Sequence, residues 1–232
     1  MAFSPSARTR TAALRAVVGA AVLAAALAGC GASPSTGEPL SSPPSHDAAP
    51  TPGTVIMIIR HGEKPDSTSP GVDANGHPDS SSLTQTGWAR ARKLAEVFAP
   101  STGETAPGLY RPKTIYAAGA NDNGEGTRTR ETVAPLAQRL GIAVDTRYGK
   151  GNENALVADA TTRPGPTLIC WQHGEIPALA RAFGSVAPTP PARWPSNRFD
   201  VIWTFTATAT GWKFNQLPES ALATDQVQGI PG

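Results

Sequence analysis

The sequence predicts an α/β fold, a three-layer α/β/α sandwich with a mostly parallel central sheet. Two apolar runs, Val55–Ile59 and Thr167–Trp171, are short and unbroken, which is typical of strands that are covered on both faces. Segments with helical periodicity alternate with these and other strand candidates along the chain. Such alternation favours helices on both faces of one sheet.

The first predicted helix begins after Thr84, whose side chain can accept a hydrogen bond from the first turn. Apolar residues from Trp88 to Phe98 then recur at helical spacing, with charged residues between them, and the helix ends near Pro100. Between the first strand and this helix, residues 63–82 are polar and contain several Pro and Gly residues. Because connections of this length are often functional, we expect the segment to overhang a site.

The middle of the chain continues the alternation. A second strand is predicted over Thr114–Ala118, followed by a helix over Thr127–Leu140 that Gly141 ends. Pro135 lies inside this helical pattern, where it should kink the helix or mark its real start. A short strand is predicted over Ala143–Asp145.

The last third of the domain adds two helices and two strands. Helices are predicted over 152–161 and 176–183, on either side of the second buried strand. The segments 201–206 and 212–217 alternate or cluster as β-structure and are joined near Gly211. They are predicted to form an antiparallel pair at the edge of the sheet.

The amino-terminal residues 1–29 resemble the signal peptide of a bacterial lipoprotein. Three arginines precede the Ala-rich apolar stretch Val17–Leu27, which is too short to span a bilayer, because about 20 apolar residues are needed. The stretch closes with Leu27-Ala28-Gly29-Cys30, which resembles a lipobox. The resemblance implies a lipidated Cys30 that anchors the chain to the extracytoplasmic face of the cell membrane. The alternative is an ordinary secretory signal in which this Cys has no role.

The rest of the chain divides into three further parts. Residues 30–53 are rich in Ser, Pro and Gly and carry almost no large apolar side chain, so they are predicted to be a flexible tether. Residues 54–217 are predicted to form one domain of ordinary size. Residues 218–232 are predicted to be a C-terminal tail.

Composition disfavours two classes of partner. The formal net charge of +2 is close to balanced, and the sequence has no basic run and no Cys/His spacing of a zinc site. Neither nucleic acid nor a structural metal is therefore expected, and no cofactor is predicted.

Cys170 lies in an apolar run and is interpreted as a small buried side chain rather than a nucleophile. The sequence does not indicate an oligomeric state.

Three residues suited to phosphate chemistry follow the first strand. Arg60-His61-Gly62 stands at its carboxyl end, where open α/β sheets bind ligands. His61 can attack phosphorus through a neutral ring nitrogen, and Arg60 can hold phosphate oxygens with two parallel N–H bonds. Gly62 lets the backbone come close to an anion.

Two further residues are expected at the same edge of the sheet. His173 follows the second buried strand, and Arg128 lies at the start of a helix, whose N-terminus adds partial positive charge. Arg60, Arg128 and His173 would surround a phosphate, with His61 beneath it. The cations would stabilise charge on the equatorial oxygens as the phosphoryl group passes to His61.

Four segments, taken in order, resemble the histidine phosphatase superfamily and its phosphoglycerate-mutase-like branch. They are Ile-Ile-Arg-His-Gly-Glu-Lys-Pro at 58–65, Leu-Thr-Gln-Thr-Gly-Trp-Ala-Arg-Ala at 83–91, Arg-Thr-Arg-Glu-Thr at 128–132 and Trp-Gln-His-Gly at 171–174. The resemblance implies a metal-independent phosphate monoester hydrolase that acts on a small phosphorylated substrate through a phosphohistidine on His61. The resemblance also implies that Arg60, Arg128 and His173 bind the phosphoryl group, with Arg130 as the alternative to Arg128.

The leaving group also needs a proton, which a carboxylic acid usually supplies near neutral pH. In mutase-like members the acid follows the second Arg at a spacing that here falls near Glu153. Glu175, two residues after His173, is the rival, although it could instead cap the following helix. Glu63 is a third candidate.

Two departures from the family pattern concern the substrate. Ser67 stands where mutase-like members commonly carry Asn, and Ala118-Gly119 replace a Ser often found after the second strand. Both argue against a true phosphoglycerate mutase, as does export from the cytoplasm. Two alternatives to the hydrolase remain: a phosphate-binding lipoprotein with little catalysis, and a phosphotransferase or mutase.

Overall fold

The structure is a computed structural model that describes residues 51–120 and 125–232. The predicted signal peptide, Cys30 and the tether up to residue 50 lie outside the described residues. In chain order the elements are β1 (Val55–Arg60), α1 (Gln85–Phe98), β2 (Thr114–Ala117), α2 (Thr127–Leu140), β3 (Val144–Asp145), α3 (Glu153–Thr162), β4 (Thr167–Trp171), α4 (Ile176–Ala182), β5 (Val186–Ala187), β6 (Val201–Thr208) and β7 (Gly211–Pro218). None of these described helices is both long and apolar enough to cross a membrane.

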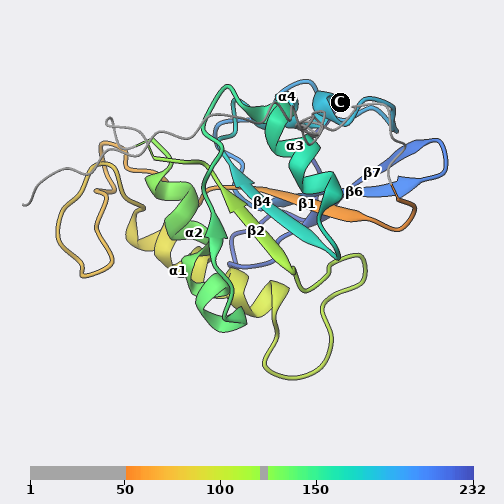
Figure 1. The fold of residues 1–232 in the computed structure, drawn as a ribbon. Coiled ribbons are helices and arrows are strands. Elements are labelled where there is room, and N and C mark those ends of the chain that lie inside the picture. Colours follow the sequence, from red (N-terminus) through yellow and green to blue (C-terminus); the bar gives the residue numbers. More distant parts are fainter. Residues whose placement is uncertain (1–50, 121–124) are drawn as a thin grey trace, which may run out of the picture. The chain divides into compact units, whose positions relative to one another are not determined.

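The described strands form one sheet in the order β3-β2-β4-β1-β6-β7-β5 (Figure 1). The neighbouring pairs β3–β2, β2–β4, β4–β1 and β7–β5 are parallel, and only β6 runs against its neighbours. The predicted mostly parallel sheet is therefore confirmed. β1 lies inside the sheet between β4 and β6, and all six of its residues are buried.

Helices cover both faces of the sheet. Met57 and Ile59 belong to an apolar cluster with residues of α1 and α2, whereas Ile56 and Ile58 belong to a cluster with residues of α3 and α4. Successive strand residues point to opposite faces, so β1 contributes to both cores at once. Figure 1 shows the two helix pairs on opposite sides of the sheet. The predicted three-layer sandwich is confirmed.

Local signals place the two helices that flank the site. Thr84 caps α1 as predicted, because its Oγ1 accepts a hydrogen bond from the Gly87 amide at 3.1 Å. Gly141 ends α2 in the left-handed region, at φ 66°, where a residue without a Cβ is favoured. Pro135 lies inside α2 and does not mark its start.

The predicted antiparallel pair is present, but the prediction that it forms the edge of the sheet is wrong. The short strand β5 lies outside β7 and occupies that edge. β6 and β7 pair from Thr208↔Gly211 to Val201↔Pro218, while β6 also pairs with β1 and β7 with β5. β5 contains only two residues. A strand of that length has no periodicity that the sequence could reveal.

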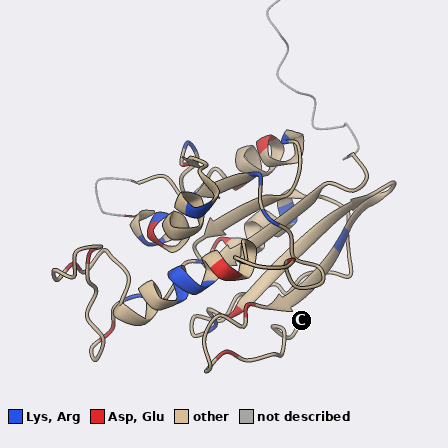
Figure 2. Cartoon of the chain, turned by 90° about the horizontal axis from the view of Figure 1, so that it is seen from below, with Lys and Arg blue, Asp and Glu red and all other residues tan. Residues whose placement is uncertain are grey.

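The segment after β7, predicted as a tail over 218–232, packs against the domain. Arg90 of α1 is buried and forms ion pairs at 2.8 Å with Glu219 and Asp225 of this segment. The same guanidinium pairs with Glu63 at 2.8 Å. These contacts join α1, the loop after β1 and the C-terminal segment. Elsewhere, acidic and basic residues are both distributed over helices and loops (Figure 2).

Candidate active site

Both predicted site histidines follow neighbouring strands. β1 and β4 are parallel and pair in register from Ile56↔Thr167 to Arg60↔Trp171. His61 directly follows β1, and its amide donates to the Trp171 carbonyl at 3.1 Å. His173 follows β4 by two residues. The two imidazoles therefore leave the sheet at the same edge.

The Arg60 side chain is fully buried at this edge. Its Nη1 donates to the carbonyl oxygens of Ser196 and Arg198, at 2.6 and 3.0 Å. Its Nε and Nη2 are buried and have no hydrogen-bond partner among the described residues. Burial lowers the pKa of Arg60 to about 10, so the side chain is still a cation at neutral pH. One edge of a buried guanidinium is thus available for a bidentate contact with an anion.

His61 is buried and held in one tautomer. Its Nδ1 lies 2.7 Å from the Gly62 carbonyl oxygen, which can only accept, so Nδ1 carries the hydrogen. Burial, and next the charge of Arg60, lower the pKa of His61 to about 3. The ring is therefore neutral at physiological pH, and Nε2 keeps its lone pair. This is the state that a nucleophilic histidine requires.

Thr132 fixes the backbone on which this tautomer depends. The Gly62 amide donates to Thr132 Oγ1 at 2.8 Å, and that hydroxyl donates to the Arg128 carbonyl at 2.7 Å. A Cβ at Gly62 would lie 3.1 Å from the Gly87 carbonyl oxygen, which explains the glycine by close packing against α1. Thr132 lies inside the segment 128–132, but nothing in that sequence indicated that its hydroxyl would hold the Gly62 amide.

Arg128 supplies a second cation beside Arg60. It is the second residue of α2, and its Nη1 donates to the Ser81 carbonyl at 3.1 Å. Its Nε is buried and has no partner in the described part of the chain. After burial, the nearby charge of Arg128 contributes to the lowered pKa of both Arg60 and His61. The structure thus brings the two guanidiniums and His61 together.

Arg130 and Glu131, which follow Arg128 in α2, make different contacts. Arg130, the alternative phosphate ligand, turns to its own helix, where its Nη2 donates to Thr127 Oγ1 at 3.3 Å. Glu131 accepts from Ser82 Oγ at 2.7 Å and from the Leu83 amide at 2.9 Å. The end of the predicted functional loop is therefore fastened to α2 and contacts Arg128. Sequence reasoning did not identify Glu131, although it lies in the same motif.

His173 is half-buried and lies near the charges of Arg60 and Lys64. Burial, then the charges of Arg60 and Lys64, lower the pKa of His173, so this ring is also neutral at pH 7. Lys64 is exposed and three residues after His61. It adds a cation near the site that the sequence analysis did not single out.

The three candidate acids differ in their partners. Glu153 begins α3, is buried, and accepts from Trp171 Nε1 and the Gly151 amide, both at 3.1 Å. Glu175 instead forms an ion pair with Lys150 at 3.2 Å, and Glu63 is bound by Arg90. Each of these two rivals is thus engaged by a cation.

Glu153 has no ion pair with any other described residue. Its partner Trp171 pairs in register with Arg60, which places Glu153 at the edge of the sheet that carries the histidines. The geometry therefore favours Glu153 over its rivals. Its role as the acid stays a prediction.

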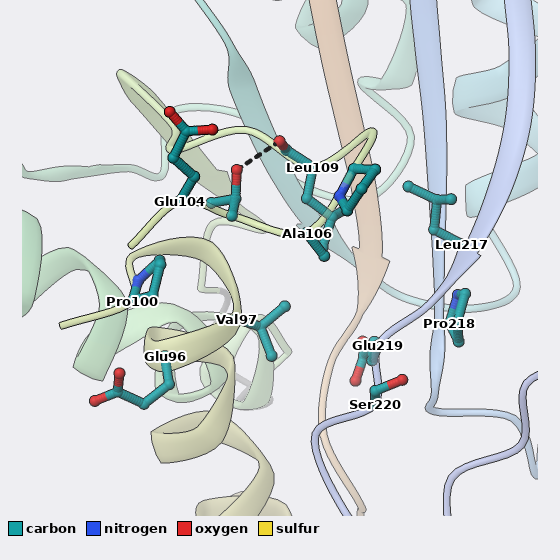
Figure 3. A pocket seen from close by; sticks show the side chains of 12 residues that line it. Glu96, Val97, Pro100, Glu104, Ala106, Leu109, Leu217, Pro218, Glu219 and Ser220 are labelled. Carbon is teal, nitrogen blue, oxygen red and sulfur yellow. Dashed lines mark hydrogen bonds between the residues drawn. The ribbon is translucent and has the colours of Figure 1, made fainter. Parts of the chain in front are cut away.

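A described cavity near the end of α1 does not coincide with this constellation. A cavity of 380 Å³ lies between the end of α1, the loop 100–109 and the end of β7, and Figure 3 shows Val97, Leu109 and Leu217 on its walls. None of the predicted site residues lines it. A phosphate site needs fixed charges rather than volume. Across the described residues, no cluster of three or more His, Cys, Asp or Glu side chains is placed to hold a metal ion.

The fold and site together define an α/β protein with two cations and a neutral histidine at the carboxyl edge of its sheet. No protein-family model and no curated protein matches the chain. Solved structures similar to it include a mycobacterial glucosyl-3-phosphoglycerate phosphatase (16% identity, TM-score 0.44, covering 71% of this chain and 97% of that one). The protein histidine phosphatase SixA (16%, 0.47, 71% and 97%) and a phosphoserine phosphatase mutant from Entamoeba histolytica (13%, 0.46, 73% and 99%) are also similar. The chemistry of the chain therefore has to follow from its own side chains.

We expect the His61→Asn variant to lose less stability than the wild type when the pH falls from 7 to 4. The pKa of His61 is about 3 in the folded protein, against an ordinary value of 6.5. The unfolded chain therefore binds the proton first, and the stability that is present above pH 6.5 is lost as the pH falls toward 3. By pH 4 the two proteins should differ in this loss by on the order of 2–3 kcal/mol. Urea unfolding at four pH values measures the difference, and parallel stability curves would contradict it.

Proposed function

We propose that the chain is a phosphate monoester hydrolase of the histidine phosphatase superfamily that acts through a phosphohistidine on His61. One observation carries the proposal. Arg60, which is buried, and Arg128, which is partly buried, carry buried N–H groups that have no partner among the described residues, beside a neutral imidazole. Leaving buried donors unpaired is costly, and a phosphate monoester with nearly two negative charges would satisfy them. The guanidiniums supply positive charge to the phosphoryl group without a metal ion.

The first half of the reaction follows from these positions. The Nε and Nη2 groups of Arg60 hold two phosphate oxygens, with Arg128 on another oxygen and His173 beside them. The lone pair of His61 Nε2 attacks phosphorus while the bond from phosphorus to the ester oxygen breaks. That oxygen takes the electron pair and receives a proton from Glu153. Throughout, the Nδ1–H of His61 remains bonded to the adjacent carbonyl, which stabilises the positive charge that develops on the ring.

The second half transfers the phosphoryl group to water. Glu153, now a carboxylate, removes a proton from a water molecule that attacks the phosphohistidine. The bond from nitrogen to phosphorus breaks, His61 regains its lone pair, and inorganic phosphate leaves. A phosphate-binding protein without catalysis would not need the fixed tautomer of His61, so the hydrogen bond to Gly62 favours the hydrolase.

We also propose that the enzyme works on the extracytoplasmic face of the cell membrane, held by a lipid on Cys30. The support is the sequence Leu27-Ala28-Gly29-Cys30 after a short apolar stretch. The segment between Cys30 and β1 is long enough to hold the catalytic domain away from the lipid headgroups. A small phosphorylated compound in that compartment would be the substrate.

Rapid mixing of the wild type with a ³²P-labelled phosphate ester, followed by an alkaline quench, should give an acid-labile label on His61. His61→Asn should carry no label and should lose turnover by on the order of 10³-fold or more. His77→Asn is the matched control, because His77 lies in an exposed loop and contacts Asp73.

Three results would speak against the hydrolase. Full activity of His61→Asn without any label would exclude a phosphohistidine at this position. Phosphate binding without turnover in the wild type would identify a binding lipoprotein. Transfer of the label to an added alcohol in preference to water would identify a phosphotransferase.

Glu153→Gln should lower turnover of alkyl phosphates by on the order of 10²–10⁴-fold, because a poor leaving group needs the proton. Turnover of 4-nitrophenyl phosphate and the affinity for inorganic phosphate should stay near the wild-type values. Glu175→Gln is the matched control. Equal losses for both ester types would remove Glu153 from the role, and a leaving-group dependence in Glu175→Gln would assign the acid to Glu175.

Wild-type protein made in a bacterium that lipidates lipoproteins should partition into detergent, and Cys30→Ser should be released or stay unprocessed. Two acyl chains give stable anchoring, whereas one gives only marginal binding. Cys170→Ala is the control, since it removes the other Cys, which is buried in β4, and should still partition. A wild-type protein that is wholly soluble, with its mature end elsewhere, would contradict the anchor.

A further inference from the structure

The guanidinium of Arg60 is constrained on one edge and on one face. Its Nη1 donates to the carbonyls of Ser196 and Arg198, which limits rotation within the guanidinium plane. The ring of Phe199 lies against the face, with Arg60 Cζ 3.7 Å from the ring centroid, which limits the tilt of that plane. The Nε and Nη2 edge is left without a partner among the described residues.

Residues 196–199, which make these contacts, are followed and preceded by residues that are themselves held by hydrogen bonds. Trp194 Nε1 donates to the Arg198 carbonyl at 2.9 Å, and Arg198 Nε donates to Asp200 Oδ1 at 2.7 Å. Residues of the C-terminal segment add two more bonds, from Arg198 Nη2 to the Gln228 carbonyl at 2.6 Å and from the Gln226 amide to Asp200 Oδ2 at 2.7 Å. The backbone around position 199 is therefore held on both sides.

Core packing does not account for Phe199. It belongs to neither of the apolar clusters that the described residues form on the two faces of the sheet, and it is only partly buried. Among the described residues, its ring lies against Arg60 and near His61, whose ring centroid is 6.4 Å away in an edge arrangement at 61°. Phe199 therefore lies beside two candidate site residues and outside the apolar core.

We propose that Phe199 is a positioning residue for phosphate binding, which fixes the plane of the Arg60 guanidinium so that its Nε and Nη2 edge faces the phosphoryl group. The proposal rests on the proposed function. A bidentate contact requires the guanidinium and two phosphate oxygens to share a plane. The two carbonyls alone hold a single nitrogen, about which the group can still tilt, whereas the aromatic face opposes that tilt through a cation–π contact.

The test compares variants at position 199 that keep or remove the aromatic face. Phe199→Leu should weaken the binding of inorganic phosphate, measured by calorimetry, by on the order of 10-fold, as expected for loss of a partly desolvated cation–π contact. The kcat/KM for 4-nitrophenyl phosphate should fall in parallel, with part of the loss in KM. Phe199→Tyr keeps the face and should restore both values to within about twofold of the wild type.

Phe183→Leu is the matched control for loss of a phenyl ring. Phe183 stacks on Phe205 in the core, with centroids 4.4 Å apart, so its variant should lower the midpoint of thermal unfolding and leave phosphate affinity unchanged. Phe199→Met serves as a second non-aromatic variant if Phe199→Leu does not fold.

The outcomes separate the two proposals. Wild type that binds no phosphate would overturn the proposed function and the role of Phe199 with it. Wild type that binds phosphate, together with Phe199→Leu or Phe199→Met of equal affinity, would overturn only the role of Phe199. A Phe199→Tyr variant as weak as Phe199→Leu would do the same, because the aromatic face would then not be what matters.

Discussion

The structure depends above all on the burial of the Arg60 charge at the carboxyl end of β1. Removing a guanidinium from water is costly unless its donors are paired. Here no carboxylate is bonded to Arg60 within the described residues; two backbone carbonyls and an aromatic face take that place. Carbonyl oxygens pair the donors of one nitrogen but do not neutralise the charge. The fold therefore leaves a positive charge in a low-dielectric setting, where it attracts an anion far more strongly than an exposed arginine would.

Burial also sets the state of the neighbouring histidine. Burial of the imidazole itself, and next the positive charge of Arg60, lower the pKa of His61 and keep it neutral, and the Gly62 carbonyl selects the tautomer with Nε2 free. The carbonyl itself is held through Gly62 and Thr132 to α2, the helix that also carries Arg128. One hydrogen-bonded chain thus links the orientation of the imidazole to the placement of the second cation, so neither can move without disturbing the other.

The C-terminal segment stabilises the site from two directions. Through Asp200 and Arg198 it anchors the backbone that faces Arg60. Through Glu219 and Asp225 it completes the ion pairs of Arg90, which also holds Glu63, two residues after His61. Removal of one partner from such a buried network typically costs about 3–5 kcal/mol, because a charge is left uncompensated. The segment after β7 is therefore part of the folded domain in physical terms.

The sequence by itself determined the elements whose signals are local. The apolar runs, the cap at Thr84 and the helix end at Gly141 are properties of neighbouring residues, and the structure has them where they were predicted. Since parallel strands present their carboxyl ends at one edge, the sequence also placed Arg60, His61 and His173 together. It did not reveal β5, which is too short to show a period, or the contact of Phe199 with Arg60. The partners of Arg60 lie 136 and 138 residues away and bind through backbone carbonyls, which every residue type carries and no motif can mark. The different partners of Glu153 and Glu175 likewise depend on tertiary structure, because only the fold pairs Lys150 with Glu175 and buries Glu153 against Trp171.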